Sequence, residues 1–420
     1  MKTLIFSLAS LLSVLFIAGS CDKNIDIDDK SDKLPDPMKI ELRSIESSMV
    51  ESDQAFAFDF FSYVFDEEKK DKNENFMVSP FSLSMALAMT WNGSANETKE
   101  AIQNTLNFGE WTDVEVNSYF KKLREAFVKT DPSTKLAIAN SIWTNESIKI
   151  LPNFIALNQD YYNATVQSVS FTDPTTVKLI NKWAFDNTEG LIKDVLDKTN
   201  PNALMYLLNA LYFKGIWTSE FDAKNTSKII FHNDDGKEPK VDMMFQNSHF
   251  NYTHDETMQL VELPYGNQAF NMMVLLPKEG KNLTDITQAL QNKEYWSNMI
   301  NRLRDTNIDL FIPKFKTEYS KKMNSVLIDM GMGIAFDSEK ANFSRMSDVQ
   351  SFISFVQQFT YIATDEVGTE AAAVTVVGME TTSMPAQPEK ITFKVDKPFI
   401  YLIQEKSTGS ILFMGSIKSL

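Results

Sequence analysis

The most informative segment of this 420-residue chain is EVGTEAAAVTVVGMETTSMP, residues 366–385. It holds no proline before Pro385, so each residue of the stretch 369–380 is able to donate to a β-ladder. Side chains alternate between the two faces of a strand. One face would then be small or apolar throughout, and both charges, Glu370 and Glu380, would fall on the other. The members of the uncharged face are Thr369, Ala371, Ala373, Thr375, Val377 and Met379. The segment is suited to enter a sheet over a core, and an ordinary half-buried strand remains the alternative.

The rest of the body mixes helical and extended patterns without regular alternation. Phe56, Phe60 and Val64 recur every four residues and predict a helix over about 41–70. Ser79 before Pro80 predicts the start of a second helix. Short β-rich runs follow later, at 209–217, 272–277, 308–313, 391–395, 399–404 and 412–417. We therefore expect an α+β fold, and because no Gly-, Ser- or Pro-rich linker divides residues 41–420, a single domain.

Composition and motifs exclude several function classes. The chain has 41 Lys and Arg against 56 Asp and Glu, a formal charge of −15, which is unfavourable for binding nucleic acid. One cysteine and three histidines leave no basis for an intramolecular disulfide or a thiolate-rich metal site. The sequence lacks the usual hydrolase, metalloprotease and nucleotide-binding motifs. We therefore expect no cofactor and no metal site.

The N-terminus has the pattern of an export signal. Lys2 precedes an apolar run over residues 4–18, shorter than the roughly 20 residues that a membrane-spanning helix needs. Ala18, Gly19 and Ser20 then precede Cys21, which resembles the bacterial lipobox except that Ala18 replaces the usual leucine. We expect a signal peptide at 1–20, lipidation of Cys21, and a polar flexible tether at 21–40. The alternative is an ordinary cleaved signal with an incidental cysteine.

The segment around Gly368 also resembles the reactive-centre-loop hinge of inhibitory serpins. The hinge residues are Glu366, Gly368, Thr369, Glu370, Ala371, Ala372 and Ala373. Further serpin-like motifs occur in the family's order at 75–82, 209–217, 397–399 and 412–415. The chain is therefore identified as a serpin-family member over about residues 45–420.

The resemblance implies a single metastable domain with three β-sheets, about eight or nine helices and an exposed loop that acts as bait. It implies a monomeric suicide-substrate inhibitor and not an enzyme. A serine protease, or in a second class of targets a cysteine protease, attacks the loop and forms an acyl-enzyme. The cut loop then inserts as a new strand of the central sheet. With the lipid anchor, we expect an extracytoplasmic protein attached to the bacterial outer membrane, with exposure at the cell surface and a periplasmic orientation as the two alternatives.

The spacing of the family places the reactive bond between Thr382 and Ser383, and cleavage after Met379, Glu380 or Thr381 remains the alternative. A small β-branched residue at Thr382 suits elastase-like or subtilisin-like proteases, and residues 367–389 contain no Lys or Arg for a trypsin-like one. The alternative function is a non-inhibitory, serpin-fold binding or chaperone lipoprotein of the envelope.

The resemblance also implies a buried polar cluster beneath the sheet, the shutter. Ser79, Ser82 and Asn209 match its usual positions, whereas Gln358 replaces a histidine that many serpins have there. An amide is able to make similar hydrogen bonds without titrating. We therefore expect the mechanism to survive this substitution without the histidine's pH sensitivity.

Overall fold

The computed structural model describes residues 34–71, 74–190, 192–193, 195–369 and 391–420. Leu34–Leu420 form one compact unit. Several residues singled out in the sequence lie outside the described part: Cys21, Glu370, Ala371, Ala372, Ala373, Thr382 and Ser383. The signal peptide predicted at 1–20 lies outside it too.

Of the two β-sheets in the described part of the chain, the smaller has six strands and contains Gly368 and Thr369 of the hinge. Its order is β10 (Phe315–Lys322), β11 (Phe355–Thr364), β12 (Gly368–Thr369), β4 (Met205–Ile216), β2 (Lys135–Asn145) and β3 (Thr165–Val169). β11 pairs directly with β4, in parallel, from Phe355 with Tyr206 to Thr360 with Leu211. Beyond that point the two strands separate and the short β12 lies between them. This six-stranded sheet is therefore closed along its middle and opened at one end.

The larger sheet has nine strands. Its order is β1 (Phe76–Val78), β15 (Ile411–Ile417), β14 (Phe399–Glu405), β8 (Phe270–Pro277), β7 (Met258–Tyr265), β6 (Lys240–His254), β9 (Arg304–Pro313) and β13 (Ile391–Lys394), with β5 (Ser227–Ile230) also paired to β6. The sequence predicted three sheets. β6 is 15 residues long and pairs with β5 at one end and β7 at the other, so its hydrogen bonds join two expected sheets into one.

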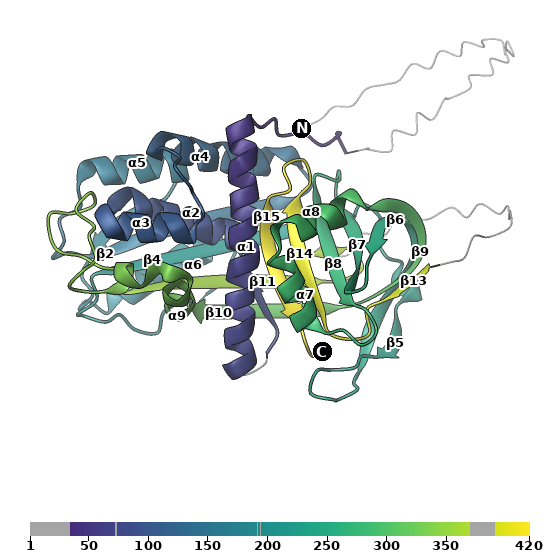
Figure 1. Cartoon of the computed structure of the whole chain (residues 1–420). Helices are drawn as coiled ribbons and strands as arrows, with labels where there is room; N and C mark the ends of the chain where they lie inside the picture. The colour runs from purple at the N-terminus through teal and green to yellow at the C-terminus, as the bar shows by residue number, and fades with distance from the viewer. Residues whose placement is uncertain (1–33, 72–73, 191, 194, 370–390) are drawn as a thin grey trace, which may run out of the picture. The chain divides into compact units, whose positions relative to one another are not determined.

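Nine α-helices occur in the described part of the chain, which confirms the α+β class (Figure 1). They are α1 (Ser44–Asp71), α2 (Pro80–Gly93), α3 (Asn96–Thr105), α4 (Asp113–Thr130), α5 (Pro152–Tyr162), α6 (Thr175–Asn187), α7 (Leu283–Leu290), α8 (Lys293–Asn301) and α9 (Asn324–Leu327). As predicted, Ser79 caps α2 and Pro80 opens it. Within the described residues, no helix has the length and apolar character required to cross a membrane.

Helices cover both faces of the six-stranded sheet. α2 is buried along its whole length, as expected of a helix that is apolar all round. On the opposite face, Ile180, Trp183 and Ala184 of α6 pack in a separate apolar cluster with alternate residues of β4, such as Tyr206 and Leu208. Even-numbered side chains of β4 thus face α6, and the odd-numbered Met205, Leu207 and Leu211 belong to the main core.

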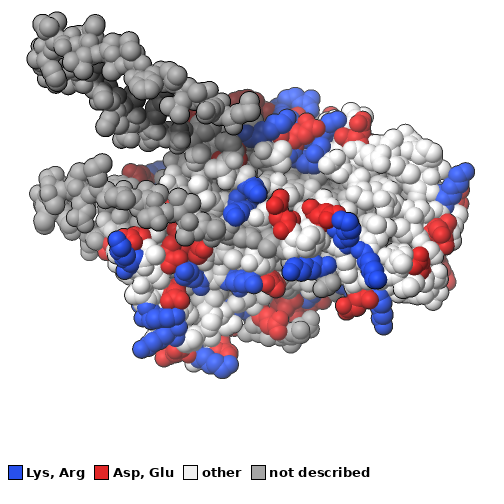
Figure 2. All heavy atoms as spheres, turned by 180° about the vertical axis from the view of Figure 1, so that it is seen from behind, with Lys and Arg blue, Asp and Glu red and all other residues white. Residues whose placement is uncertain are grey.

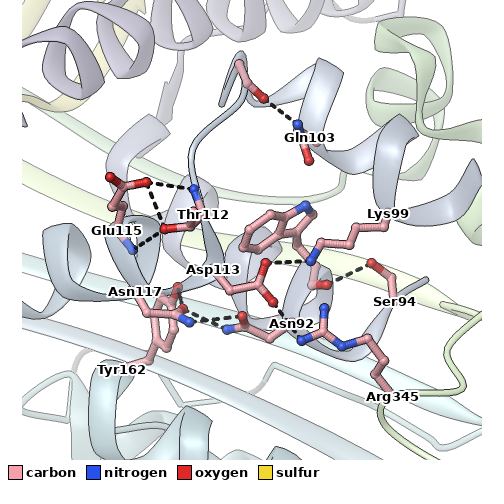
Figure 3. A network of polar contacts seen from close by, with 12 residues as sticks. Asn92, Ser94, Lys99, Gln103, Thr112, Asp113, Glu115, Asn117, Tyr162 and Arg345 are labelled. Carbon is pink, nitrogen blue, oxygen red and sulfur yellow. Dashed lines mark hydrogen bonds and ion pairs between the residues drawn. The ribbon is translucent and has the colours of Figure 1, made fainter. Parts of the chain in front are cut away.

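A network of hydrogen bonds and ion pairs links the helices α2, α3 and α4 (Figure 3). The Asp113 carboxylate lies 2.6 Å from Lys99 Nζ and 2.6 Å from an Arg345 guanidinium nitrogen. Burial opposes ionisation of Asp113, but the hydrogen bonds from both cations outweigh it and lower its pKa. Deeper inside, the Asn92 and Asn117 side chains bond to each other at 2.8 and 3.1 Å. The ion pairs thus link α3 and α4 to the segment after α9, and the asparagine pair links α2 to α4.

The body begins earlier than the predicted boundary at residue 41. Ile40 is 5% exposed, and its amide donates to Ser407 Oγ at 3.0 Å. The Met38 carbonyl accepts from Thr130 Oγ1 at 2.6 Å. Residues 38–40 therefore contact the folded unit, although residues 34–39 are exposed. The predicted tether over 21–33 lies outside the described residues.

Charged side chains are mixed on the surface seen from behind (Figure 2). Among the described residues visible there, Lys and Arg are interspersed with Asp and Glu. Recognition of a nucleic-acid backbone needs a clustered basic surface. The face drawn in Figure 2 does not present one.

Candidate functional site

The loop hinge begins with a tight turn after β11. The Asp365 carboxylate accepts from the amides of Val367 at 2.9 Å and Gly368 at 3.2 Å. The Asp365 amide donates to the Gly368 carbonyl at 2.9 Å. An aspartate that bonds to the amides two and three residues on stabilises such a turn. The chain consequently reverses and returns as β12 toward the gap between β11 and β4.

Backbone hydrogen bonds hold this turn to the segment that follows β4. The Trp217 amide donates to the Val367 carbonyl at 2.8 Å, and the Phe221 amide donates to the Glu366 carbonyl at 2.9 Å. The Trp217 indole Nε1–H donates to the Asp365 carbonyl at 2.9 Å. Three successive hinge residues are thus paired, so the base of the loop is well fixed.

Glu366 adds a charged contact to the hinge. Its carboxylate lies 2.6 Å from Lys314 Nζ and accepts from Thr226 Oγ1 at 2.8 Å. Burial would raise the pKa of Glu366, but the hydrogen bonds from Lys314 and Thr226 outweigh it and hold the pKa below its usual value. Glu366 is therefore ionised at neutral pH and links the hinge to the end of β9.

β12 already lies between β4 and β11, at the end of the sheet where these two strands separate. Gly368 pairs with Ile216 and Thr369 with Gly215 on β4, while Thr369 also pairs with Thr364 on β11. A Cβ on Gly368 would lie 2.2 Å from the Gly215 carbonyl oxygen, so only glycine fits here. Thr369 is fully buried, with its Oγ1 2.5 Å from the Tyr265 hydroxyl.

The shutter cluster lies further down the same two strands, where β11 and β4 still pair directly. We define it as Ser79, Ser82, Asn140, Asn209 and Gln358, all 3% exposed or less. The Gln358 amide group bridges the two strands and α2: Nε2 donates to Asn209 Oδ1 at 3.0 Å and to the Ser79 carbonyl at 2.8 Å. Gln358 Oε1 accepts from the Ser79 amide at 2.9 Å.

Asn209 completes the shutter cluster. Its Nδ2 donates to Asn140 Oδ1 at 2.6 Å and to the Ser82 carbonyl at 3.0 Å, and it also contacts the Ser82 hydroxyl. Ser79 Oγ donates to the Leu412 carbonyl at 2.8 Å. Together with these contacts, Gln358 makes three hydrogen bonds within the shutter cluster, two to the Ser79 backbone and one to Asn209.

The structure brings together two groups of residues singled out in the sequence. Glu366, Gly368 and Thr369 lie in the hinge, and Ser79, Ser82, Asn209 and Gln358 meet in the shutter cluster. Sequence reasoning missed Lys314, Thr226, Tyr265 and Asn140. Nothing local marked them, because each is recognised only by a partner that is distant in the sequence.

Within the described residues, no group of three or more His, Cys, Asp or Glu side chains could hold a metal ion. His232 and His249 form separate surface pairs with Glu238 and Asp305, each at 3.0 Å.

Comparison with known proteins agrees with this geometry. The family model described as serpin (serine protease inhibitor) matches residues 51–420, and the chain belongs to this family. A leukocyte elastase inhibitor of Xenopus laevis is 34% identical over 378 residues, covering 87% of this chain and 97% of that protein.

Solved structures show the same architecture. A thermophilic serpin, tengpin, in its native state aligns with a TM-score of 0.83 at 30% identity, covering 92% of this chain and 97% of that chain. Human thyroxine-binding globulin complexed with its ligand aligns with a TM-score of 0.81 at 26% identity, covering 90% and 99%. Serpins are generally protease inhibitors rather than enzymes, and some proteins with this fold are not inhibitory.

Proposed function

We propose that this serpin is a suicide-substrate inhibitor of serine proteases, with cysteine proteases as a second class of targets. A protease attacks the reactive bond and becomes esterified to the loop. The cut loop then enters the six-stranded sheet between β4 and β11 before the acyl-enzyme is hydrolysed. The observation that carries this proposal is β12, a strand of two residues that already lies in that position.

Continuation of the β12 register gives each loop residue a partner. Thr369 pairs with Gly215 and Thr364. In antiparallel pairing, Thr375, six residues on, would lie between Asn209 and Gln358. Insertion would therefore separate the Gln358 and Asn209 side chains, whose 3.0 Å hydrogen bond now links the strands. The Thr375 hydroxyl offers a donor and an acceptor at that level.

In the same register, the inserted loop would reach the first residue of β4. Met379, ten residues after Thr369, would pair with Met205, the first residue of β4. A fully inserted strand would thus match the 12 residues of β4, about 40 Å at roughly 3.3 Å per residue. The reactive bond predicted at Thr382 and Ser383 would lie just beyond the far end. An attached protease would be carried the length of the sheet.

The two faces of the loop also suit this sheet. Thr369 faces the core beside Tyr265, so Ala371, Ala373, Thr375, Val377 and Met379 would face it as well. Glu370 and Glu380 would point to the α6 side. No charge would enter the core, which is the arrangement that insertion requires.

For the target, we propose an elastase-like or subtilisin-like protease that cuts between Thr382 and Ser383. The supporting observations are the small β-branched Thr382 and the absence of Lys and Arg at 367–389. The family relationship to a leukocyte elastase inhibitor is consistent with it.

The test is to mix the protein with a panel of elastase-, subtilisin-, chymotrypsin- and papain-type proteases. We expect an SDS-stable complex with an elastase- or subtilisin-type enzyme and a cut after Thr382. In Thr369→Arg, the same bond should be cut without a complex, because insertion would bury an unpaired charge. Complete turnover of the unmodified protein without complex would contradict the proposal, as would undiminished inhibition by Thr369→Arg.

A second candidate function is non-inhibitory binding within the envelope. Thyroxine-binding globulin shows that this fold occurs in a complex with a small molecule. The hinge argues against this candidate, since Gly368, Thr369 and the alanines that follow are small and free of proline.

For its location, we propose that residues 1–20 are removed on export and that Cys21 carries lipid at the outer membrane, facing the cell surface. Growth of a bacterial host with labelled palmitate should label the protein, and Cys21→Ser should abolish the label. A labelled Cys21→Ser protein would refute the anchor. Protease shaving of whole cells distinguishes surface exposure from a periplasmic orientation.

A further inference from the structure

Tyr265 is a buried aromatic residue whose hydroxyl contacts the hinge. Its ring stacks on Trp217, with centroids 4.5 Å apart and planes 10° from parallel. The edge-on Phe213 ring is 5.1 Å away. Gly215 makes room for the ring, because a Cβ there would lie 2.9 Å from Tyr265 Cδ1. The ring is therefore confined on several sides, and its hydroxyl has a fixed position in the gap between β4 and β11.

That hydroxyl has Thr369 as its partner. The two oxygens are 2.5 Å apart, and both residues are fully buried. Burial raises the pKa of Tyr265 well above its ordinary value, so the hydroxyl is neutral and is able to donate or accept. Loss of either hydroxyl would leave the other buried without this bond.

We propose that Tyr265 is a positioning residue that sets the register in which the reactive loop enters the sheet. This inference rests on the proposed inhibitory function. The Tyr265 hydroxyl selects a side chain with a hydroxyl at the first inserted core-facing position, and the loop offers Thr369 there.

The register matters because the two faces of the loop differ. A slip by one residue would exchange every side chain between the faces. Glu370 would then replace Thr369 beside Tyr265, and a carboxylate would be buried among Trp217 and Phe213. In the register that Gly368 and Thr369 begin, only small or apolar side chains would follow Thr369 into the core. The contact thus rejects the neighbouring register as well as supporting the correct one.

The inhibitory test compares Tyr265→Phe with the unmodified protein. The first attack on the reactive bond should proceed at a rate within about twofold of normal, because the Tyr265 hydroxyl contacts the hinge, at Thr369. The proportion of cut loops that fail to trap the protease should rise about fivefold, which corresponds to a net hydrogen bond of about 1 kcal/mol.

Four further variants, one of them a control, separate positioning from general stability. Thr369→Val keeps the shape but removes the hydroxyl and should behave as Tyr265→Phe does, whereas Thr369→Ser should retain most of the trapping. The double variant Tyr265→Phe with Thr369→Val should be no worse than either single one, because both remove the same bond. Tyr252→Phe is the matched control: it removes a tyrosine hydroxyl that bonds Gln259 at 2.9 Å, away from the hinge, and should trap normally.

A readout without protease keeps the proposal distinct from the inhibitory function. Amide hydrogen exchange at Val367–Thr369 in the uncleaved protein should become about fivefold faster in Tyr265→Phe and stay unchanged in Tyr252→Phe. Unchanged exchange in Tyr265→Phe would overturn the proposal, as would faster exchange with unaltered trapping. If exchange rises but no protease is trapped even by the unmodified protein, the positioning role stands and the proposed inhibitory function fails.

Discussion

Asp53 is a buried carboxyl group that takes no part in the hinge or the shutter cluster. It lies on α1, 7% exposed, and accepts from Ser84 Oγ of α2 at 2.8 Å and from the Tyr119 hydroxyl of α4 at 2.6 Å. Burial raises the pKa of Asp53 to about 6, although both hydrogen bonds oppose this. Asp53 thus links α1, α2 and α4 through hydrogen bonds. At neutral pH its carboxylate is ionised and buried, which lowers the stability of the folded state.

Asp53 should make the stability of the uncleaved protein depend on pH. Because its folded pKa exceeds the ordinary value of 3.8, the folded state binds more protons than the unfolded state between those values. The free energy of unfolding should therefore rise by about 1 kcal/mol from this group as the pH falls from about 7.5 to about 5. Asp53→Asn should be more stable than the unmodified protein at about pH 7.5, by about 1–3 kcal/mol, and should lack this gain.

Urea unfolding of both proteins at the two pH values measures the effect. Other groups contribute to both curves, so the quantity of interest is the difference between them. A difference that does not change with pH would show that Asp53 is not the group responsible.

At the scale of single elements, the position of β12 depends on a close approach between its backbone and the backbone of β4. Gly368 lies against the Gly215 carbonyl and Ile216 Cα, where a Cβ would come within 2.2 and 2.7 Å. Neither neighbour is a flexible side chain, so β4 or β12 would have to move to admit a methyl group.

Gly368→Ala should therefore displace β12 from between β4 and β11 without unfolding the body. We expect faster amide exchange at residues 365–369 and a weaker capacity to trap protease. Gly333→Ala is the control, because a Cβ there would meet only Ile328 Cγ2, at 3.7 Å. Retention of slow exchange in Gly368→Ala would show that β12 tolerates the extra atom and that the glycine is not required.

For the molecule as a whole, the six-stranded sheet is incomplete at its centre. β11 and β4 pair directly over only six residues of each strand, and β12 fills one end of the gap. Insertion of a cut loop would replace those pairs with a central strand bonded on both sides. About ten added hydrogen bonds, at about 1 kcal/mol each, would be opposed by the backbone entropy of ordering the loop. These two terms nearly balance, so the expected gain comes from burial of Val377 and Met379, at roughly 1.5–3 kcal/mol each.

Cleavage within the loop should therefore raise the thermal unfolding temperature by about 5 °C. The measurement is a melting curve before and after limited proteolysis, with the cut confirmed by mass. Thr369→Arg, cut in the same way, should gain less because its hinge resists burial. Equal melting temperatures before and after cleavage of the unmodified protein would contradict insertion.

The sequence by itself determined the class of this protein and much of its local structure. The Ser79–Pro80 start of α2 and the β-rich runs were readable because each depends on neighbouring residues or on a period of two. The sequence also placed Ser79, Ser82, Asn209 and Gln358 in one cluster, but only through the family resemblance.

Tertiary structure alone decided which partners these residues have. The Gln358 bridge from Ser79 to Asn209, the Lys314 contact with Glu366 and the Tyr265 contact with Thr369 join residues far apart in the chain. Such pairs depend on the order and register of strands in a sheet, which no local pattern encodes. The same register explains why Thr369 already lies between β4 and β11 in the uncleaved protein. Residues 366–369, which begin the segment that opened the sequence analysis, therefore form both a turn and the start of a strand.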